Sequence, residues 1–347
     1  MMTSMVLNKA GIYALLIISA LLIGLTEFGL SGKPGALLLT LLFWSGIAQG
    51  CIALVAVCEL VRARWIASLR RELLSLYPLL LMLPLLFLFL WPQLDLYPWV
   101  KHPNLWLNKP FFMIRNMTLL LAVFFAGRHL AHRSLARQPA GSAAVVYLLL
   151  FVTSQSLIAF DVLMSLAWPW ISTLLGAYFF TEALYGAAAV SGLLMLLYFK
   201  RKSHENTLDA KAHLRDISLL MFGFSVLWGG LFFAQFLLLW YGNLPEEVGY
   251  ILDLISTSPG RELAWLFPLG LFLAPFILLL AASAKHSRPM IAGVAGTVLA
   301  GLFIERLCLV LPTVPLHGGA LLFYNLLLIA VTLLILHSTV DSTAHPD

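Results

Sequence analysis

The sequence predicts an all-α integral membrane protein, and two observations carry that prediction. Of its 347 residues, 61% are hydrophobic and only 11% are charged, and the mean hydropathy is +0.94. A soluble domain has about 25% charged residues, so little of this chain can face water. The apolar residues are also gathered into runs of about 20 residues or more, which is the length that crosses a bilayer as a helix.

Ten such apolar runs follow one another along the chain, within what we expect to be a single membrane domain over 1–347. Gly and Pro mark several of the turns between them, as at Gly32-Lys33-Pro34. Each run is therefore expected to form one membrane-spanning helix. The runs cover residues 12–29, 35–61, 74–91, 110–129, 143–167, 170–199, 216–241, 262–284, 288–311 and 318–337.

The distribution of basic residues predicts an orientation. Fifteen of the 21 Lys and Arg residues lie near the N-terminus and in the loops after the second, fourth, sixth and eighth runs. The opposite loops hold only Lys33, Lys101, Lys109 and Arg261. Short basic loops stay in the cytoplasm, so both termini are predicted to be cytoplasmic. This clustering also accounts for the net charge of +5 without a nucleic-acid partner.

The loops on the opposite, outer side are rich in tryptophan. An aromatic belt explains part of this enrichment, but belts occur on both sides of a membrane, and here the inner side has only Trp65. We therefore expect the outer loops to dock an extracytoplasmic partner as well. The residues predicted to make this contact are Trp99, Trp106, Trp240, Glu246 and Glu247.

Ionisable residues inside the apolar runs are the strongest functional signal. A charged side chain in hydrocarbon is costly, and such residues mark pathways and binding sites. Asp161 shares a helical face with Ser165, and Glu182 shares one with Tyr178 and Tyr185. Two basic residues, Arg115 and Arg306, and a further acid, Glu305, also fall inside runs, and all three are expected in one layer with Asp161, close to the outer surface.

Two interpretations of these residues remain open at this point. In the first, Arg115 or Arg306 forms buried ion pairs with Asp161 or Glu305 and holds the helices in register. In the second, the residues line a polar cavity that passes protons. Glu182 is expected nearer the midplane, with no basic residue at its level, which would make it the proton relay and Asp161 the structural or gating partner.

The histidines and cysteines argue against a resident redox centre. A b-type haem needs axial ligands, commonly His, at membrane depth. All nine His residues lie in loops or at the ends of runs, and the three Cys residues form no CxxC motif. We therefore expect no haem and no Fe–S cluster in this chain, so any electron transfer would use centres in other subunits.

Four segments together resemble a known family. They are NKPFFMIR at 108–115, FDVLMSLAWPWISTLLGAYFF at 160–180, HLRDISLLMFGF at 213–224 and FAQFLLLWYGNLPEE at 233–247. In this order, on ten helices, they resemble the ActF-type membrane subunit of alternative complex III, a bacterial quinol:cytochrome c oxidoreductase. The subunit belongs to the NrfD-like family, which is related to the polysulfide reductase anchor. Where that family has a Trp after the Asp, this chain has Val162.

The resemblance implies an architecture and a set of partners. It implies two four-helix bundles, over 35–167 and 170–311, with peripheral helices at 12–29 and 318–337. It implies assembly in the bacterial cytoplasmic membrane with periplasmic Fe–S and multihaem cytochrome c subunits and a second NrfD-like subunit. In such a complex the chain would be a scaffold with a proton path and contact to a quinol or menaquinol, a subunit of an enzyme in respiratory electron transport and no catalyst alone.

Two other functional classes stay open on the sequence. Ten helices with buried acids also suit a proton-coupled secondary transporter, although no pair of Gly/Pro-interrupted helices stands at matching places in the two halves. A purely structural membrane anchor is the third hypothesis. Co-purification of c-type haem would favour the respiratory subunit over both.

Overall fold

The computed structural model describes residues 9–31, 35–63, 65–201, 207–243, 245–256, 258–282 and 284–341. This described part of the chain is helical and contains no strand. The α-helices are α1 (Lys9–Thr26), α2 (Gly35–Leu60), α3 (Arg70–Ser75), α4 (Leu79–Leu88), α5 (Lys109–Leu135), α6 (Gly141–Leu157), α7 (Leu175–Arg201), α8 (Thr207–Gly242), α9 (Pro245–Ser256), α10 (Gly260–Pro268), α11 (Ala274–Leu280), α12 (Arg288–Val310) and α13 (Gly318–Asp341).

Ten helical spans among the described residues are long and apolar enough to cross a membrane, as the sequence predicts. Seven are single α-helices or nearly so, and three are composite. The third joins α3 and α4, the fifth continues α6 through a π-helical segment, η5 (Ile158–Leu163), and the eighth joins α10 and α11 through another, η7 (Leu269–Leu273). The protein is therefore a multi-pass, all-α membrane protein.

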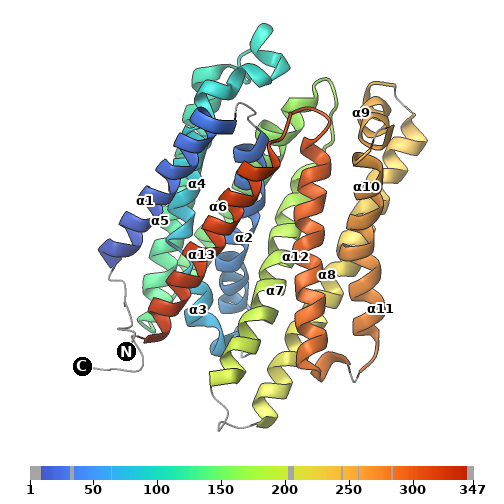
Figure 1. Ribbon diagram of the computed structural model, residues 1–347. Helices are drawn as coiled ribbons and strands as arrows, with labels where there is room; N and C mark the ends of the chain where they lie inside the picture. Colours follow the sequence, from blue (N-terminus) through green and yellow to red (C-terminus); the bar gives the residue numbers. More distant parts are fainter. Residues whose placement is uncertain are drawn as a thin grey trace.

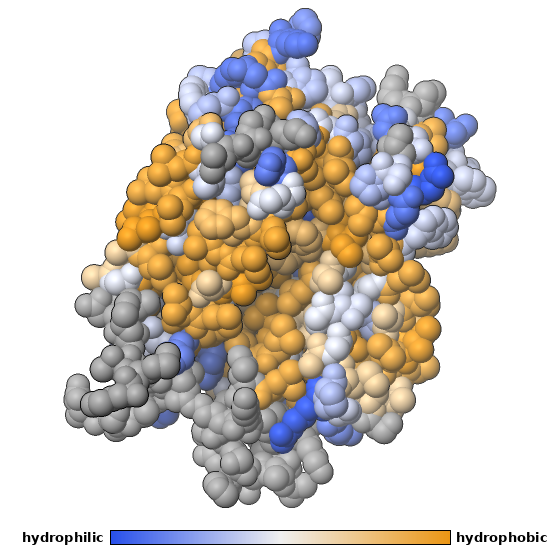
Figure 2. Space-filling view, viewed as in Figure 1, coloured by the Kyte–Doolittle hydropathy of each residue, from blue (hydrophilic) through white to orange (hydrophobic). Residues whose placement is uncertain are grey.

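The spans stand side by side as a bundle of roughly parallel and antiparallel rods (Figure 1). An even number of crossings brings the start of α1 and the end of α13 to the same side, which we call the N/C side; the opposite side is the far side. A broad apolar belt separates hydrophilic residues at the two ends (Figure 2). This surface is the one that burial in hydrocarbon requires.

Helix α2 is the centre of the packing. Of the most hydrophobic window of its span, 83% is buried inside the protein, against 28% for the spans of α8 and α13. Its tightest contact is with α7, where a Cβ added at Gly50 would lie 2.0 Å from the carbonyl oxygen of Ala183. Small residues let membrane helices approach this closely. Because α2 packs on both α6 and α7, it joins the two halves of the chain; their division into two four-helix bundles stays a prediction.

The predicted loops contain more helix than the sequence suggested. The segment 200–215, expected as a polar loop, is helical at both ends, because α7 runs to Arg201 and α8 begins at Thr207. The long far-side connection 242–261 contains the amphipathic helix α9. The segment 92–108 forms two short 3₁₀ turns, η3 (Trp91–Leu96) and η4 (Pro98–Lys101). These far-side elements cover the ends of the spans that carry the buried charges.

Candidate functional site

One buried charged group centres on the carboxylate of Asp161, a residue that is 1% exposed. It lies in the π-helical segment η5, toward the far side of the membrane. Such segments widen the helix by one residue and recur at functional sites. A buried carboxylate in hydrocarbon needs donors and a counter-charge, and the surrounding helices supply both.

Every oxygen of the Asp161 carboxylate is occupied. Arg115 of α5 donates to Oδ2 from Nη2 at 2.5 Å and from Nε at 3.0 Å. Asn116 donates to the same oxygen at 2.9 Å, and the indole of Trp106 donates to Oδ1 at 3.2 Å. One guanidinium balances one carboxylate, so this group of four residues, the Asp161 cluster, is neutral and saturated. The ion pair is one of those that the sequence allowed.

The far-side segment 92–108 closes this cluster from outside. The Arg115 guanidinium lies over the Trp106 ring, 4.0 Å from its centroid. Trp99 donates from Nε1 to the hydroxyl of Ser165 at 3.1 Å, and that hydroxyl donates to the backbone carbonyl of Asp161 at 2.5 Å. Tyr97 donates to the carbonyl of Val162 at 2.9 Å, and its burial raises the pKa of Tyr97, which keeps the hydroxyl a donor.

The burial of Trp99 contradicts the prediction made for it from the sequence. It was expected to dock a partner, but it is only 4% exposed and its indole nitrogen is already bonded to Ser165. The amphipathic indole was assigned to the surface because its segment lies outside the spans, whereas the loop folds back onto the helix ends. Trp106 and Trp240 are 52% and 68% exposed, so both still present surface. Glu246 and Glu247 lie in α9, but their side chains are outside the described part of the structure.

The second buried group centres on Glu182 of α7. Arg306 of α12 forms an ion pair with Oε2 of Glu182, and the indole of Trp228 on α8 donates to Oε1 at 3.0 Å. The Arg306 guanidinium also lies over the Phe179 ring, 3.7 Å from its centroid. Glu182 is 2% exposed and Arg306 is 5% exposed, so the pair is buried from both water and lipid.

A second acid, Glu305, completes this group. Tyr178 donates its hydroxyl to Oε1 of Glu305 at 2.6 Å. Within the described residues no donor reaches Oε2 of Glu305 or pairs with Nη1 of Arg306. The carboxyl groups of Glu182 and Glu305 are close enough to interact, and a hydrogen bond between them requires a proton on one of the two. We call Glu182, Glu305, Arg306, Tyr178 and Trp228 the Glu182 cluster.

The Glu182 cluster therefore differs from its neighbour in charge balance. It has two acids for one guanidinium, all buried. With both acids ionised it would carry a net negative charge in a medium that penalises any unpaired ion. One bound proton makes it neutral. The arrangement suits a group that takes up and releases a proton.

This geometry overturns the expected depth of Glu182. The sequence placed it twelve residues from the far-side turn, roughly 18 Å deep at 1.5 Å per residue, beyond the reach of any basic residue. Helix α7 instead begins at Leu175, seven residues before Glu182. At about 10 Å from its helix end, Glu182 is level with Arg306, four residues before the end of α12. The prediction of an unpaired Glu182 was therefore wrong.

The remaining predicted path residues do not join the two clusters into a chain. Ser165 supports the backbone of Asp161, as described above. Tyr185 donates to the carbonyl of Leu271 at 2.9 Å, within the π-helical segment η7. Tyr178 serves Glu305 and does not reach Asp161. Within the described residues, no hydrogen bond connects Asp161 with Glu182.

Several buried polar residues escaped the sequence analysis. Trp228 looked like one more apolar residue of its run, although an indole N–H at membrane depth needs a partner. Glu27, at the end of the first span, accepts from Tyr324 at 2.8 Å and from Gln93 at 3.1 Å. Gln49 of α2 is fully buried, and neither atom of its amide group has a partner among the described residues. For Glu27 and Gln49, the signal available in the sequence was a polar Glu or Gln within an apolar run.

The fold and these clusters define a multi-pass helical membrane protein with two buried carboxylate–arginine groups. Within the described residues, no group of three or more His, Cys, Asp or Glu could hold a metal ion. No protein-family model matches the sequence, and comparison with curated proteins gave no match.

Proposed function

We propose that this chain is a non-haem membrane subunit of a bacterial quinol-oxidising respiratory complex of the alternative complex III type. It would act as a scaffold for periplasmic Fe–S and multihaem cytochrome c subunits and a second NrfD-like subunit, with a proton site of its own. The proposal joins the resemblance of residues 108–115, 160–180, 213–224 and 233–247 with the buried clusters. The observation that carries the proton site is the excess acid in the Glu182 cluster.

The two clusters support a division of roles. The saturated Asp161 cluster ties α5, α6 and the far-side segment together, which suits the scaffold. The Glu182 cluster holds one acid more than its arginine balances, which suits proton exchange. Glu305, whose Oε2 has no donor among the described residues, is the group in this cluster from which a proton enters or leaves. Glu182, held by Arg306 and Trp228, is its proton-sharing neighbour.

The proposal includes an orientation. The bias of basic residues places the N/C side in the bacterial cytoplasm and the far side, with the segments 92–108 and 242–261, in the periplasm. The clusters then lie near the periplasmic surface, where subunits that carry redox centres would dock. A cysteine at residue 205 should resist an impermeant thiol reagent on intact spheroplasts, while one at Trp240 should react. Labelling in the reverse pattern would contradict the orientation.

Purification tests the proposed complex. Affinity-tagged protein extracted in mild detergent should carry c-type haem and Fe–S absorbance from partner subunits, and mass spectrometry should identify them. The subunit separated from its partners should show no Soret band. A lone, colourless protein would remove the respiratory assignment.

Proteoliposomes test the proton site. Glu305→Gln should assemble normally but slow proton uptake coupled to quinol oxidation by at least about tenfold, because the amide cannot exchange a proton. Asp161→Glu is the control, because it alters a buried acid that lies outside the proposed proton site and retains the negative charge of that acid. Unchanged coupling in Glu305→Gln would leave only the scaffold.

A secondary transporter is the second candidate, and one observation favours it. A cavity of about 730 Å³ lies between the far-side ends of α7, α8, α10 and α12. Transporters hold their substrates in such cavities. However, the π-helical segments of the described residues occur in the fifth and eighth spans and at the end of the first, η1 (Glu27–Ser31), and these spans do not occupy matching places in the two halves. Substrate counterflow by the isolated protein, without haem-bearing partners, would establish this alternative.

A further inference from the structure

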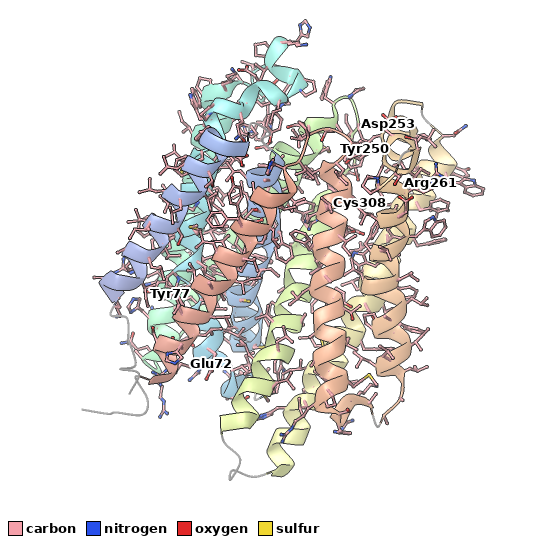
Figure 3. All side chains as sticks on the ribbon, viewed as in Figure 1. Glu72, Tyr77, Tyr250, Asp253, Arg261 and Cys308 are labelled. Carbon is pink, nitrogen blue, oxygen red and sulfur yellow. The ribbon has the colours of Figure 1, made fainter. Side chains whose placement is uncertain are left out.

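The two charge clusters leave a cavity of about 730 Å³ unexplained. Helices α7, α8, α9, α10 and α12 enclose it near the far side. In Figure 3 this region lies where Cys308 of α12 faces the α9–α10 hairpin, with Tyr250 and Arg261 at the same level. Its volume falls in the range of roughly 300–1,000 Å³ that small-molecule sites occupy.

The wall of the cavity is mostly aromatic and aliphatic. Rings from three elements face it, among them Trp170, Phe232, Phe236, Trp265 and Phe267. Flat apolar walls of this kind suit a flat ring system. Phe236 and Trp265 are also 54% and 75% exposed on the outside of the bundle. The cavity therefore continues to the lipid-facing surface, and a lipid-soluble molecule can enter it from the membrane.

The polar side chains of the cavity are those of Arg261, Gln235, Glu305 and Tyr178, and the indole of Trp170 adds an N–H. Ser172 donates to Oε1 of Gln235 at 2.6 Å, and the Trp170 N–H has no partner among the described residues. Arg261 lies at the exposed edge, where its guanidinium donates to the carbonyls of Ile255 and Ser256 at 3.2 and 2.9 Å. The carboxyl of Glu305 and the hydroxyl of Tyr178 belong to the buried wall. The Tyr178 hydroxyl is already committed to Oε1 of Glu305.

Glu305 is the acidic group of the cavity that points to a ligand with a hydrogen-bond donor. It lines the cavity, it is 2% exposed, and its Oε2 receives no donor among the described residues. Leaving a buried acceptor unsatisfied carries a free-energy cost, because the group has lost its hydrogen bonds to water. Glu182 can offset this cost only when a proton is shared between the two acids. A hydroxyl on a molecule inside the cavity can do so directly.

We propose that this cavity binds a lipid-soluble hydroxylated ring, the chemistry of a quinol or its quinone. The ring lies among the aromatic side chains, its hydroxyl donates to Oε2 of Glu305, and its apolar tail leaves toward the lipid past Phe236 and Trp265. In the oxidised form a protonated Glu305 donates to the ring carbonyl. An acyl chain fits the apolar wall equally well, but it has no donor for Glu305, and for this reason we favour the ring.

This inference rests on the proposed function for the source of the ligand, because a quinol-oxidising complex works on such molecules. It adds a location that is separate from the Asp161 cluster, and it involves binding alone. Glu305 also belongs to the Glu182 cluster, so the acid that meets the ligand has a second acid beside it to share a proton. The site thus joins the unbalanced cluster to the membrane phase.

The test is photo-crosslinking of the full chain, purified in detergent with its associated subunits, by an azido derivative of a short-tailed quinone. Peptide mapping should place the label on 232–236, 264–268 or 305–309. Ala264→Trp fills the cavity without touching a charge and should reduce labelling at least tenfold. Ala330→Trp, on the exposed face of α13, is the matched control and should leave labelling unchanged.

A second measurement isolates the hydrogen bond to Glu305. Equilibrium binding should be at least tenfold tighter for decylubiquinol than for a decyl-substituted ring without ring oxygens. Glu305→Leu should abolish that preference, and it should leave the binding of the oxygen-free analogue unchanged, which reports that the variant is folded.

Three outcomes would overturn the proposal. The first is labelling only at other helices, and the second is labelling that Ala264→Trp does not reduce. The third is equal binding of the oxygen-free analogue and the quinol, which would identify an acyl-chain site. These outcomes are distinguishable from failure of the proposed complex. Quinone bound at Glu305 in a preparation without c-type haem would keep the site and remove the complex.

Discussion

The two buried acid–arginine groups lie toward the same side of the membrane, yet they are built differently. The Asp161 cluster pairs one carboxylate with one guanidinium and fills every carboxylate oxygen with a donor. The Glu182 cluster has two carboxyl groups for one guanidinium and leaves one carboxyl oxygen and one guanidinium nitrogen without partners among the described residues. The first is covered by a folded loop, whereas the second adjoins a cavity of about 730 Å³ whose lining includes the exposed rings of Phe236 and Trp265.

The contrast shows how a membrane protein can use the same residue types for two purposes. In a saturated pair both carboxylate oxygens already accept hydrogen bonds, so neither is free to bind a ligand. The charges of such a pair only hold helices together. A pair with a surplus acid is neutral only when one acid binds a proton, and it leaves a polar atom without a partner among the described residues. The difference lies in the number of partners, because the carboxylates themselves are similarly buried: Asp161 is 1% exposed, and Glu182 and Glu305 are each 2% exposed.

Neutralising one acid in each cluster should separate the two most clearly. Asp161→Asn leaves Arg115 buried without a counter-charge, and loss of one partner of a buried pair costs about 3–5 kcal/mol. Glu182→Gln should cost less, about 1–2 kcal/mol, because Glu305 remains to balance Arg306. Thermal unfolding in one detergent, with yield of folded protein, measures both. Equal losses would mean that Glu305 gives Arg306 no compensation.

The two far-side tryptophans should differ in a similar way. Trp99→Ala removes a buried ring and its bond to Ser165 under the Asp161 cluster, so unfolding free energy should fall by about 3–5 kcal/mol. Trp240→Ala, at the exposed end of α8, should leave stability unchanged and weaken the association of partner subunits. Native gels and thermal unfolding separate these effects. An intact assembly in Trp240→Ala would make that residue part of the membrane belt alone.

The smallest effect should come from the exposed ion pair at the start of α5. Lys109 and Asp95 are 2.7 Å apart, but the Asp95 side chain is 76% exposed. Exposed pairs contribute about 0–1 kcal/mol. Lys109→Ala should therefore change stability by less than about 1 kcal/mol, although α5 carries Arg115 six residues later. A loss as large as that of Asp161→Asn would show that the Asp161 cluster depends on how α5 begins.

Properties that are local along the chain could be predicted from the sequence. Ten apolar runs became ten spans, most within a few residues of the expected ends, because crossing hydrocarbon requires about 20 consecutive apolar residues. The same locality identified Asp161, Glu182, Glu305, Arg115 and Arg306 as the costly residues, since each interrupts an apolar run. The Asp161–Arg115 pair was among the pairings that their depths allowed.

Which charges meet depends on the packing of the helices and could not be predicted from the runs. The start of α7 at Leu175 set the depth of Glu182 and brought it level with Arg306, and no apolar run marks that position because hydropathy continues smoothly across it. The folding of the 92–108 segment buried Trp99, and the packing of α9 and α10 formed the cavity beside Glu305. Composition sets the cost of a buried charge, but the rotation and starting residue of each helix set which partner compensates it.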